Sequence, residues 1–245
     1  MFQPASLKGQ SPTPIDERIR HKSLIIYIFV ILLSFVPCSI FAYLYIRILW
    51  KNGYYLAFFL LLPLNIFLFI YILQFSAIFI SKLFLIIVNL IHNPKEGTFD
   101  RSIKDKEYFY WNLRNAIKKW PLFIIATNPF PWFKNRFTLR FFGVTIGRNC
   151  ICDNAWISSE LVRIGKNVII GMGTVILTFG IEQDKFILKT IEIGDNVEIG
   201  AKCVILPGTK IKSNTKLSAH SYTNYNSILE ENKIYEGHPA QIKKV

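Results

Sequence analysis

The chain has 245 residues, enough for one sizeable domain beside a membrane region, or for two small domains. Half of the residues are apolar, 21 of them Phe, and the formal net charge is +13. Because the positive charge lies largely beside hydrophobic segments, and no aromatic–basic motif of known spacing is present, the composition argues against nucleic acid and favours a negatively charged membrane surface as the partner.

The amino-terminal part begins with a polar stretch, residues 1–23, which we interpret as a cytoplasmic tail. It is followed by 23 uncharged residues from Leu24 to Ile46, long enough to cross a bilayer with some tilt. Pro37 is expected to kink this helix without abolishing it. Too many polar residues precede the segment, and no small-residue cleavage site follows it, for a removed signal peptide.

A second apolar run extends from Leu56 to Ile91, after a turn at Asn52–Gly53. About 20 residues suffice for one crossing, so the run contains either one span with a helical extension or two spans. We favour a transmembrane helical hairpin that is formed by residues 24–92, because it places the tail and the basic segment after Ile91 on the same, cytoplasmic side. A three-span alternative would put the two ends on opposite sides.

Residues 93–143 combine aromatic and basic side chains at helical spacing, as in "KEYFYWNLRNAIKKW". This pattern predicts an interfacial helical linker that lies in the headgroup layer. Packing of the same aromatic side chains against the following domain is the alternative. The residues concerned are Trp111, Trp120, Trp132, Lys118, Lys119, Lys134 and Arg136.

From about Val144 the sequence has a period of six, which neither a helix nor a plain strand has. The tetrads Ile146–Asn149, Ile164–Asn167 and Ile193–Asn196 each read aliphatic, Gly, polar, Asn. Such repeats are typical of a solenoid. Aliphatic residues recur at Ile193, Ile199, Ile205, Ile211 and Leu217.

The period fits a coil with three flat faces, in which each face is a short strand and three hexapeptides make one turn. Ile193 should then lie directly below Ile211. Gly and Asn are expected to supply unusual backbone angles at the corners. A small residue four positions after each aliphatic one should also point inward, and these are Cys150, Val168, Thr174, Val197, Cys203, Thr209 and Thr215.

Two segments, "IGDNVEIGAKCVILPGTKI" and the ending "IYEGHPAQIKKV", resemble the hexapeptide-repeat acyltransferases. The resemblance covers residues 144–245 and implies a β solenoid, the left-handed parallel β-helix, preceded here by transmembrane and interfacial α-helices. It also implies a homotrimer that transfers an acyl group from acetyl-CoA or another acyl-CoA, with the active site between neighbouring protomers. The acceptors of the family are sugars, amino sugars or amino acids.

The period of six is interrupted between Ile176 and Ile193, where either a loop leaves the coil or one turn is irregular. The family often carries a catalytic His here, but this sequence has Phe179 and Gly180. Three interpretations remain for the general base: Glu182 or Asp184 near the loop, His220 in the last coil, or no chemistry at all. The corresponding structural interpretations are a solvated loop for the two acids and an exterior corner for His220.

For coenzyme A, the resemblance implies that Ala201, Lys202 and Ala219 line the pantetheine groove and that Lys243 or Lys244 approaches the phosphates. These lysines are equally explained as ordinary surface charge. The cysteines form no CxxC and no His cluster completes a zinc site, so we expect reduced, structural thiols, with Cys203 in the core, and no metal.

Two functions follow. The first is a membrane-anchored O- or N-acetyltransferase, or another acyltransferase, that acts on a sugar or lipid-linked cell-envelope precursor with its β-helix on the cytoplasmic face. The alternative is a non-catalytic trimeric scaffold or binding protein at the membrane. A γ-type carbonic anhydrase needs three His on neighbouring coils, and the repeats contain one.

Overall fold

The computed structural model describes residues 20–102, 104–130, 132–152, 154–182 and 184–243, with side chains from residue 24 onward. Nearly all of the predicted tail, and Lys244, therefore lie outside the described residues. The described chain folds as two compact units. One is a helical unit of residues 19–93 and 111–127, and the other is a β unit of residues 94–110 and 128–245.

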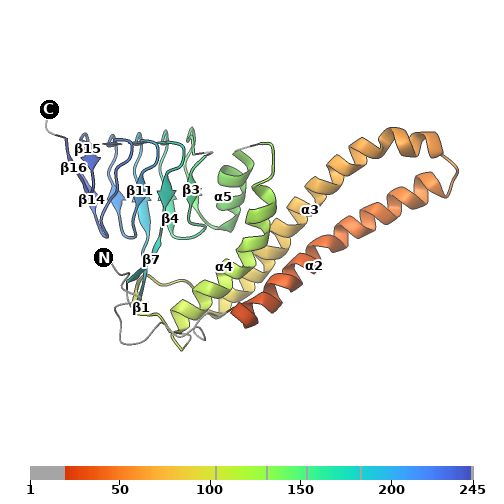
Figure 1. Ribbon diagram of the computed structural model, residues 1–245, viewed down its shortest axis with the longest axis horizontal. Coiled ribbons are helices and arrows are strands. Elements are labelled where there is room, and N and C mark those ends of the chain that lie inside the picture. The colour runs from red at the N-terminus through yellow and green to blue at the C-terminus, as the bar shows by residue number, and fades with distance from the viewer. Residues whose placement is uncertain (1–19, 103, 131, 153, 183, 244–245) are drawn as a thin grey trace, which may run out of the picture. The chain divides into compact units, whose positions relative to one another are not determined.

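The helical unit is built on a helical hairpin (Figure 1). Helix α2 (Arg20–Tyr45) continues into a π-helical segment, η2 (Ile46–Trp50), and α3 (Tyr55–Ile91) follows after a short turn. The second half of α4 (Lys106–Ile125) packs on this hairpin, where Gln74 and Ser81 donate hydrogen bonds to carbonyls of α4. All buried residues of α3 lie from Gln74 onward, so its first half has α2 as its partner within this unit.

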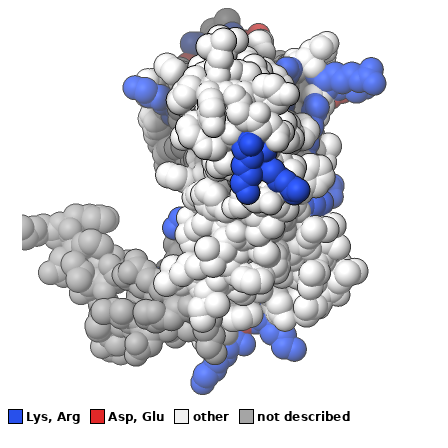
Figure 2. Space-filling view, turned by 90° about the vertical axis from the view of Figure 1, so that its right-hand side faces the viewer, with Lys and Arg blue, Asp and Glu red and all other residues white. Residues whose placement is uncertain are grey.

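Two segments of this unit, Leu24–Trp50 and Tyr55–Ile91, are long and apolar enough to cross a membrane, judged by length and composition. Most of their large apolar side chains are exposed, including Leu56, Leu60 and Leu90 at 85%, 77% and 82%. Figure 2 shows a broad uncharged surface with small groups of Lys and Arg. A soluble unit rarely exposes so much contiguous apolar surface.

The β unit is a coil with three parallel sheets, one on each face (Figure 1). The first face stacks β2 (Thr145–Ile146), β4 (Val162–Ile164), β9 (Ile191–Ile193), β12 (Lys210–Ile211) and β14 (Ile228–Leu229). The second face stacks β5 (Ile169–Ile170), β10 (Glu198–Ile199), β13 (Lys216–Leu217), β15 (Ile234–Gly237) and the antiparallel β16 (Ala240–Ile242). The third face stacks β3 (Trp156–Ile157), β6 (Val175–Ile176) and β11 (Val204–Ile205).

The stacking register confirms the predicted core. Ile211 pairs with Ile193, one full turn apart, and Ile199 pairs with Leu217. The small residues four positions later are inside as well, each at most 1% exposed. A strand side chain alternates between two faces, so each two-residue strand places one residue in the core and one outside.

The corners of the coil depend on Asn and Gly in different ways. Asn167, Asn196 and Asn214 adopt left-handed backbone angles, and their side-chain amides form a hydrogen-bonded ladder with 3.0 and 3.1 Å contacts. The prediction of unusual angles at the corner glycines holds at Gly173 and Gly208, with φ of 73° and 80°, but not at the glycines of the tetrads. Gly165 and Gly194 have ordinary angles, but a Cβ on either would lie 2.7 Å from the backbone of the next turn.

The amino-terminal end of the coil is closed by η3 (Phe133–Thr138) and α5 (Leu139–Phe142). Asn135 donates to the carbonyls of Cys152 and Ala155, while Arg136 and Arg140 donate to carbonyls at Cys150 and Gly147. A solenoid needs such caps because its terminal turn has no neighbour to satisfy its backbone.

The linker of residues 93–143 contains more than the expected helices. A strand, β1 (Gly97–Asp100), precedes α4, and the side chain of Lys118 is 2% exposed. A lysine that is buried to this degree packs inside the protein, so Lys118 does not fit the predicted position in the headgroup layer. The interfacial role of the other aromatic and basic residues remains a prediction.

Candidate functional site

A β-hairpin leaves the coil at the corner between the third and first faces. It consists of β7 (Phe179–Glu182) and β8 (Lys185–Leu188), and it occupies the place where the period of six fails. Strand β1 pairs with the other edge of β8, which makes a three-stranded antiparallel sheet. Phe186 and Leu188 are fully buried, and Phe186 meets the ring of Tyr108 at 5.2 Å. The hairpin is therefore an anchored extension of the coil.

Two contacts hold β1 to the hairpin region. The carboxylate of Glu96 accepts hydrogen bonds from the hydroxyl of Thr190 at 2.6 Å and from its backbone N–H at 3.1 Å. The Thr190 hydroxyl is the main reason that the pKa of Glu96 is lowered. Lys185 pairs with Asp100 at 2.6 Å, and this contact raises the pKa of Lys185.

The predicted acids Glu182 and Asp184 lie at the tip of this hairpin and are exposed. The backbone carbonyl of Asp184 accepts a hydrogen bond from the N–H of Arg101 at 2.8 Å. The structure thus places both carboxylates within one turn, with open access to solvent.

Behind the tip, Tyr225 packs on the hairpin. A Cβ on Gly180 would lie 2.4 Å from the Tyr225 hydroxyl, so the missing side chain at Gly180 is what admits the phenol. Burial raises the pKa of Tyr225, and the negative charge of Glu182 adds to this effect. Lys189 donates to the amide oxygen of Asn226 at 2.7 Å.

Tyr225, Lys189 and Asn226 were missed by the sequence analysis. Tyr225 and Asn226 occupy a corner of the coil that only the folded hairpin brings next to Gly180 and Lys189. Asn226 is one more corner residue, with a φ of 57°, and the Asn at this position was the only signal that the sequence offered.

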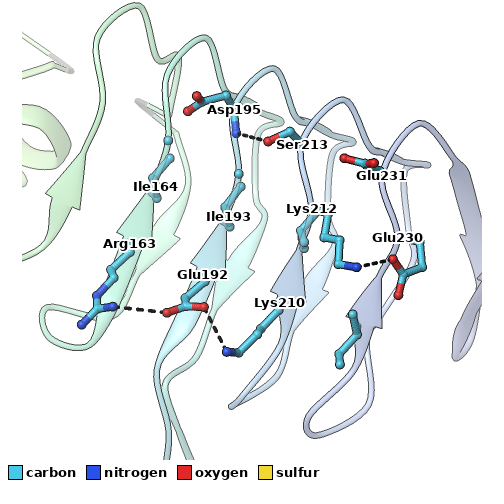
Figure 3. A pocket seen from close by; sticks show the side chains of 14 residues that line it. Arg163, Ile164, Glu192, Ile193, Asp195, Lys210, Lys212, Ser213, Glu230 and Glu231 are labelled. Carbon is cyan, nitrogen blue, oxygen red and sulfur yellow. Dashed lines mark hydrogen bonds and ion pairs between the residues drawn. The ribbon is translucent and has the colours of Figure 1, made fainter.

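The first face, beside this corner, carries a charged groove of about 740 Å³ (Figure 3). Glu192 lies between Arg163 and Lys210, with both ion pairs at 3.2 Å, and Lys212 pairs with Glu230. These pairs are exposed, so each is worth roughly 0–1 kcal/mol. All three cations of the groove are paired with carboxylates.

The third face has a different character. Its outward side chains are Trp156, Val175, Val204 and Tyr222, stacked in register from turn to turn. Trp156 is 48% exposed. This apolar strip lies between the hairpin corner and the opposite corner of the same face.

Four of the remaining predicted residues lie at that opposite corner, between the second and third faces: Ala201, Lys202, Ala219 and His220. His220 and Lys202 are exposed and left-handed, with φ of 60° and 54°, and the His220 N–H donates to the carbonyl of Ala201 at 2.9 Å. Ala201 and Ala219 stack tightly there, since a Cβ on Gly171 or Gly200 would meet their backbone nitrogens at 2.4 or 2.3 Å. One protomer therefore places His220 and the two hairpin acids at different edges of the third face.

Of the two lysines predicted to approach the phosphates, only Lys243 lies in the described residues, and it differs from the predicted groove residue Lys202. Lys243 is paired with Glu236 at 2.9 Å, whereas Lys202 has no ion pair among the described residues. Cys203 is fully buried, as expected, and burial raises the pKa of its thiol. Within the described ranges, no group of three or more His, Cys, Asp or Glu residues could hold a metal ion.

Comparison with known proteins identifies the repeat. Residues 190–224 match the family model described as bacterial transferase hexapeptide (six repeats). The chain carries a bacterial-transferase hexapeptide repeat. The resemblance inferred from the sequence is therefore confirmed, and the matched segment contains strands β9 to β13 of the coil.

This hexapeptide-repeat chain is 40% identical over 60 residues to the Bacillus subtilis (strain 168) protein named "Putative acetyltransferase YvoF". The match covers 24% of the chain and about a third, 35%, of that relative.

Solved structures with a similar coil include a maltose O-acetyltransferase from Clostridium difficile 630, 21% identical with a TM-score of 0.41. That match covers 52% of this chain and 82% of the other. The hexapeptide-repeat acetyltransferase VCA0836 of Vibrio cholerae O1 biovar eltor, solved with acetyl coenzyme A, is 20% identical with a TM-score of 0.41. That match covers 50% of this chain and 81% of the VCA0836 chain.

Proposed function

We propose that the protein is a membrane-anchored acyltransferase that moves an acyl group, in the simplest case acetyl, from coenzyme A to a sugar or lipid-linked cell-envelope precursor. The observation that carries the proposal is the hexapeptide coil, matched over residues 190–224 and interrupted by an anchored hairpin. The 40% identical segment shared with YvoF supports the same reaction class. The left-handed sense of the coil is part of this proposal.

The helical unit supplies the tether. Its two long apolar segments cross the bilayer, and the basic tail keeps the β unit on the cytoplasmic face. A tethered enzyme meets a membrane-borne acceptor at a raised effective concentration, so a weak acceptor site suffices.

In the proposed reaction, the acceptor hydroxyl or amine attacks the thioester carbonyl of acyl-coenzyme A. The new ester or amide bond forms, the C–S bond breaks, and the acceptor proton passes through the base to the leaving thiolate. Glu182 is the proposed base, because its carboxylate is exposed on the hairpin that replaces the family's His position. Asp184 and His220 are the other candidates.

A trimer would complete the site. The apolar third face is suited to contact a neighbouring copy, whereas the charged first face is suited to solvent. Such packing brings the hairpin corner of one protomer and the His220 corner of the next to the edges of one interface. Lys202, which has no ion pair within the described part of the chain, is then the better placed cation for a coenzyme A phosphate.

A non-catalytic scaffold at the membrane remains the second candidate. It is favoured by one observation: Gly180 is covered by the ring of Tyr225 from the same chain. The position where the family often has His is therefore filled by the Tyr225 phenol. A scaffold would keep the trimer and the tether, and would not require Glu182 and Asp184 of the β-hairpin.

The test is release of free thiol from acyl-coenzyme A by purified full-length protein in detergent, with a membrane extract as the acceptor. The proposal expects extract-dependent thiol release that falls at least about 100-fold when the base is removed. Glu182→Gln, Asp184→Asn and His220→Asn distinguish the three bases. Asn suits position 220 because it tolerates the left-handed backbone. Silence across a range of acyl-coenzyme A donors and extracts would favour the scaffold.

A further inference from the structure

An apolar groove runs between α2 and α3, the two helices of the helical hairpin, near the turn that connects them. It has a volume of about 420 Å³, within the usual range of ligand sites. One wall is the stripe Phe41, Leu44, Tyr45 and Ile48, and the other is Leu61, Leu64, Asn65 and Leu68. Both stripes follow the i, i+3, i+4, i+7 spacing, so each presents one helix face to the groove.

The groove lies next to two cations that have no acid near them. Arg47 is in η2, directly before the groove residue Ile48, and Lys51 follows η2. Both side chains are exposed, and the sequence contains no Asp or Glu between residues 24 and 92. Among the described residues neither cation has an ion pair, so both are available to an external anion.

The turn carries the features of a segment at the membrane–water boundary. Trp50 stacks edge-on with Tyr55 and Phe58 at 4.9 and 5.3 Å, and Tyr45 donates its hydroxyl proton to the Phe58 carbonyl. Trp and Tyr prefer the headgroup level. The π-helical segment η2 is itself rare, and such segments often mark functional positions.

We propose that this groove binds one hydrocarbon chain of an anionic phospholipid, whose phosphate is held by Arg47 and Lys51. The proposal rests on the membrane insertion that forms part of the proposed function, but not on acyl transfer. In a bilayer the groove gains no hydrophobic free energy, since lipid tails are as apolar as Leu. The groove therefore supplies shape, and the two cations supply the selectivity for an anionic headgroup.

A helix from a second copy is a poorer occupant of the groove. Helices that associate in membranes approach through small residues such as Gly, Ala and Ser. The lining residues, which also include Leu49, are all larger than these, and six of the nine are Leu or Ile. A flexible acyl chain fills the space between such side chains, whereas a helix would be held away by them.

The experiment uses full-length protein reconstituted into phosphatidylcholine vesicles that contain a trace of photoactivatable phosphatidylglycerol or photoactivatable phosphatidylcholine. Flotation with the vesicles shows insertion. We expect label from phosphatidylglycerol to concentrate on residues 41–49 and 61–68, and to exceed label from phosphatidylcholine by at least about fivefold, the effect expected from one cation near an anionic lipid.

Two pairs of variants test shape and charge separately. Leu64→Trp should fill the groove and reduce labelling there, while Leu60→Trp, at an exposed position outside the groove, should not. Arg47→Gln with Lys51→Gln should abolish the preference for phosphatidylglycerol, while the charge-conserving exchange Arg47→Lys with Lys51→Arg should retain it. Equal helix content by circular dichroism shows that each variant folds.

Failure of flotation would overturn this proposal and the membrane anchor together. Flotation with even labelling along both helices, or equal labelling by the two lipids, would overturn the groove alone. Equal labelling of Leu64→Trp and Leu60→Trp would do the same, as would cross-links that join groove residues of two copies. Acyl transfer is measured separately, so its presence or absence does not affect these outcomes.

Discussion

Glu96 accepts two hydrogen bonds from Thr190, a residue 94 positions later in the chain. Thr190 is 7% exposed and immediately precedes β9, at the point where the hairpin returns to the coil. The contact joins the segment that follows the apolar helices to the base of the candidate site. The folding of the β-hairpin therefore depends on the segment that precedes β1 and contains Glu96.

The first prediction concerns this contact. Because the folded-state pKa of Glu96 is lowered, its stabilisation is fully present above the unfolded value near 4.5 and is lost as the pH falls through the folded value. Glu96→Gln should cost about 1 kcal/mol at pH 7, a modest amount because the carboxylate is exposed on its outer side.

Thermal unfolding of the two proteins between neutral and acid pH measures the effect. The gap between wild type and Glu96→Gln should close as the pH is lowered past 4.5. Glu231→Gln, at an exposed carboxylate of the last coil, serves as the control and should leave the pH profile unchanged. A constant gap at all pH values would show that Glu96 acts by packing and not by charge.

The second prediction concerns the fit of Tyr225 on Gly180. Gly180→Ala should destabilise the hairpin by about 1 kcal/mol, because the added methyl would meet the phenol oxygen at 2.4 Å and the Tyr225 side chain would have to shift. Tyr225→Ala removes the clash, so the double variant should lose less than the sum of the two single losses. A double-mutant cycle on the free energy of unfolding checks this, and strict additivity would contradict it.

The third prediction tests the third face as a protomer contact. Val204→Glu places a charge in the apolar strip and should convert the proposed trimer to monomers, because burying an unpaired carboxylate is costly. Thr145→Glu, at an exposed position of the first face, is the matched control. Light scattering of the detergent-solubilised protein gives the mass. A trimer that survives Val204→Glu but not Thr145→Glu would assign the interface to the other face.

The fourth prediction separates the two candidate phosphate cations. Lys202→Asn should raise the KM for acetyl-coenzyme A by about tenfold, the value of one hydrogen bond to a charged group. Lys243→Asn should change it less, since Lys243 already pairs with Glu236. Asn keeps the left-handed backbone at position 202. Steady-state kinetics decide, and a larger effect at Lys243 would reverse the assignment.

The coil was predictable because its determinants are local and repeat. The period of six fixed which residues point inward, and Ile193 and Ile211 pair as expected. The candidate site was not predictable, because the contacts that shape it are distant in sequence. Gly97–Asp100 becomes a strand only by pairing with β8, and Tyr225 lies on Gly180 only after the coil between them has formed. The tetrad glycines, such as Gly165 and Gly194, were misjudged because a close approach between turns leaves no signal in the sequence pattern.

Transfer of a radiolabelled acetyl group from acetyl-coenzyme A to an extractable membrane acceptor tests the central claim most directly. Wild-type protein should label the acceptor, and the triple variant Glu182→Gln, Asp184→Asn, His220→Asn should not, at an unchanged melting temperature. Equal labelling of the acceptor by the triple variant would remove these residues from the chemistry. No labelled acceptor with the folded wild type, across donors and extracts, would contradict the assignment as an acyltransferase.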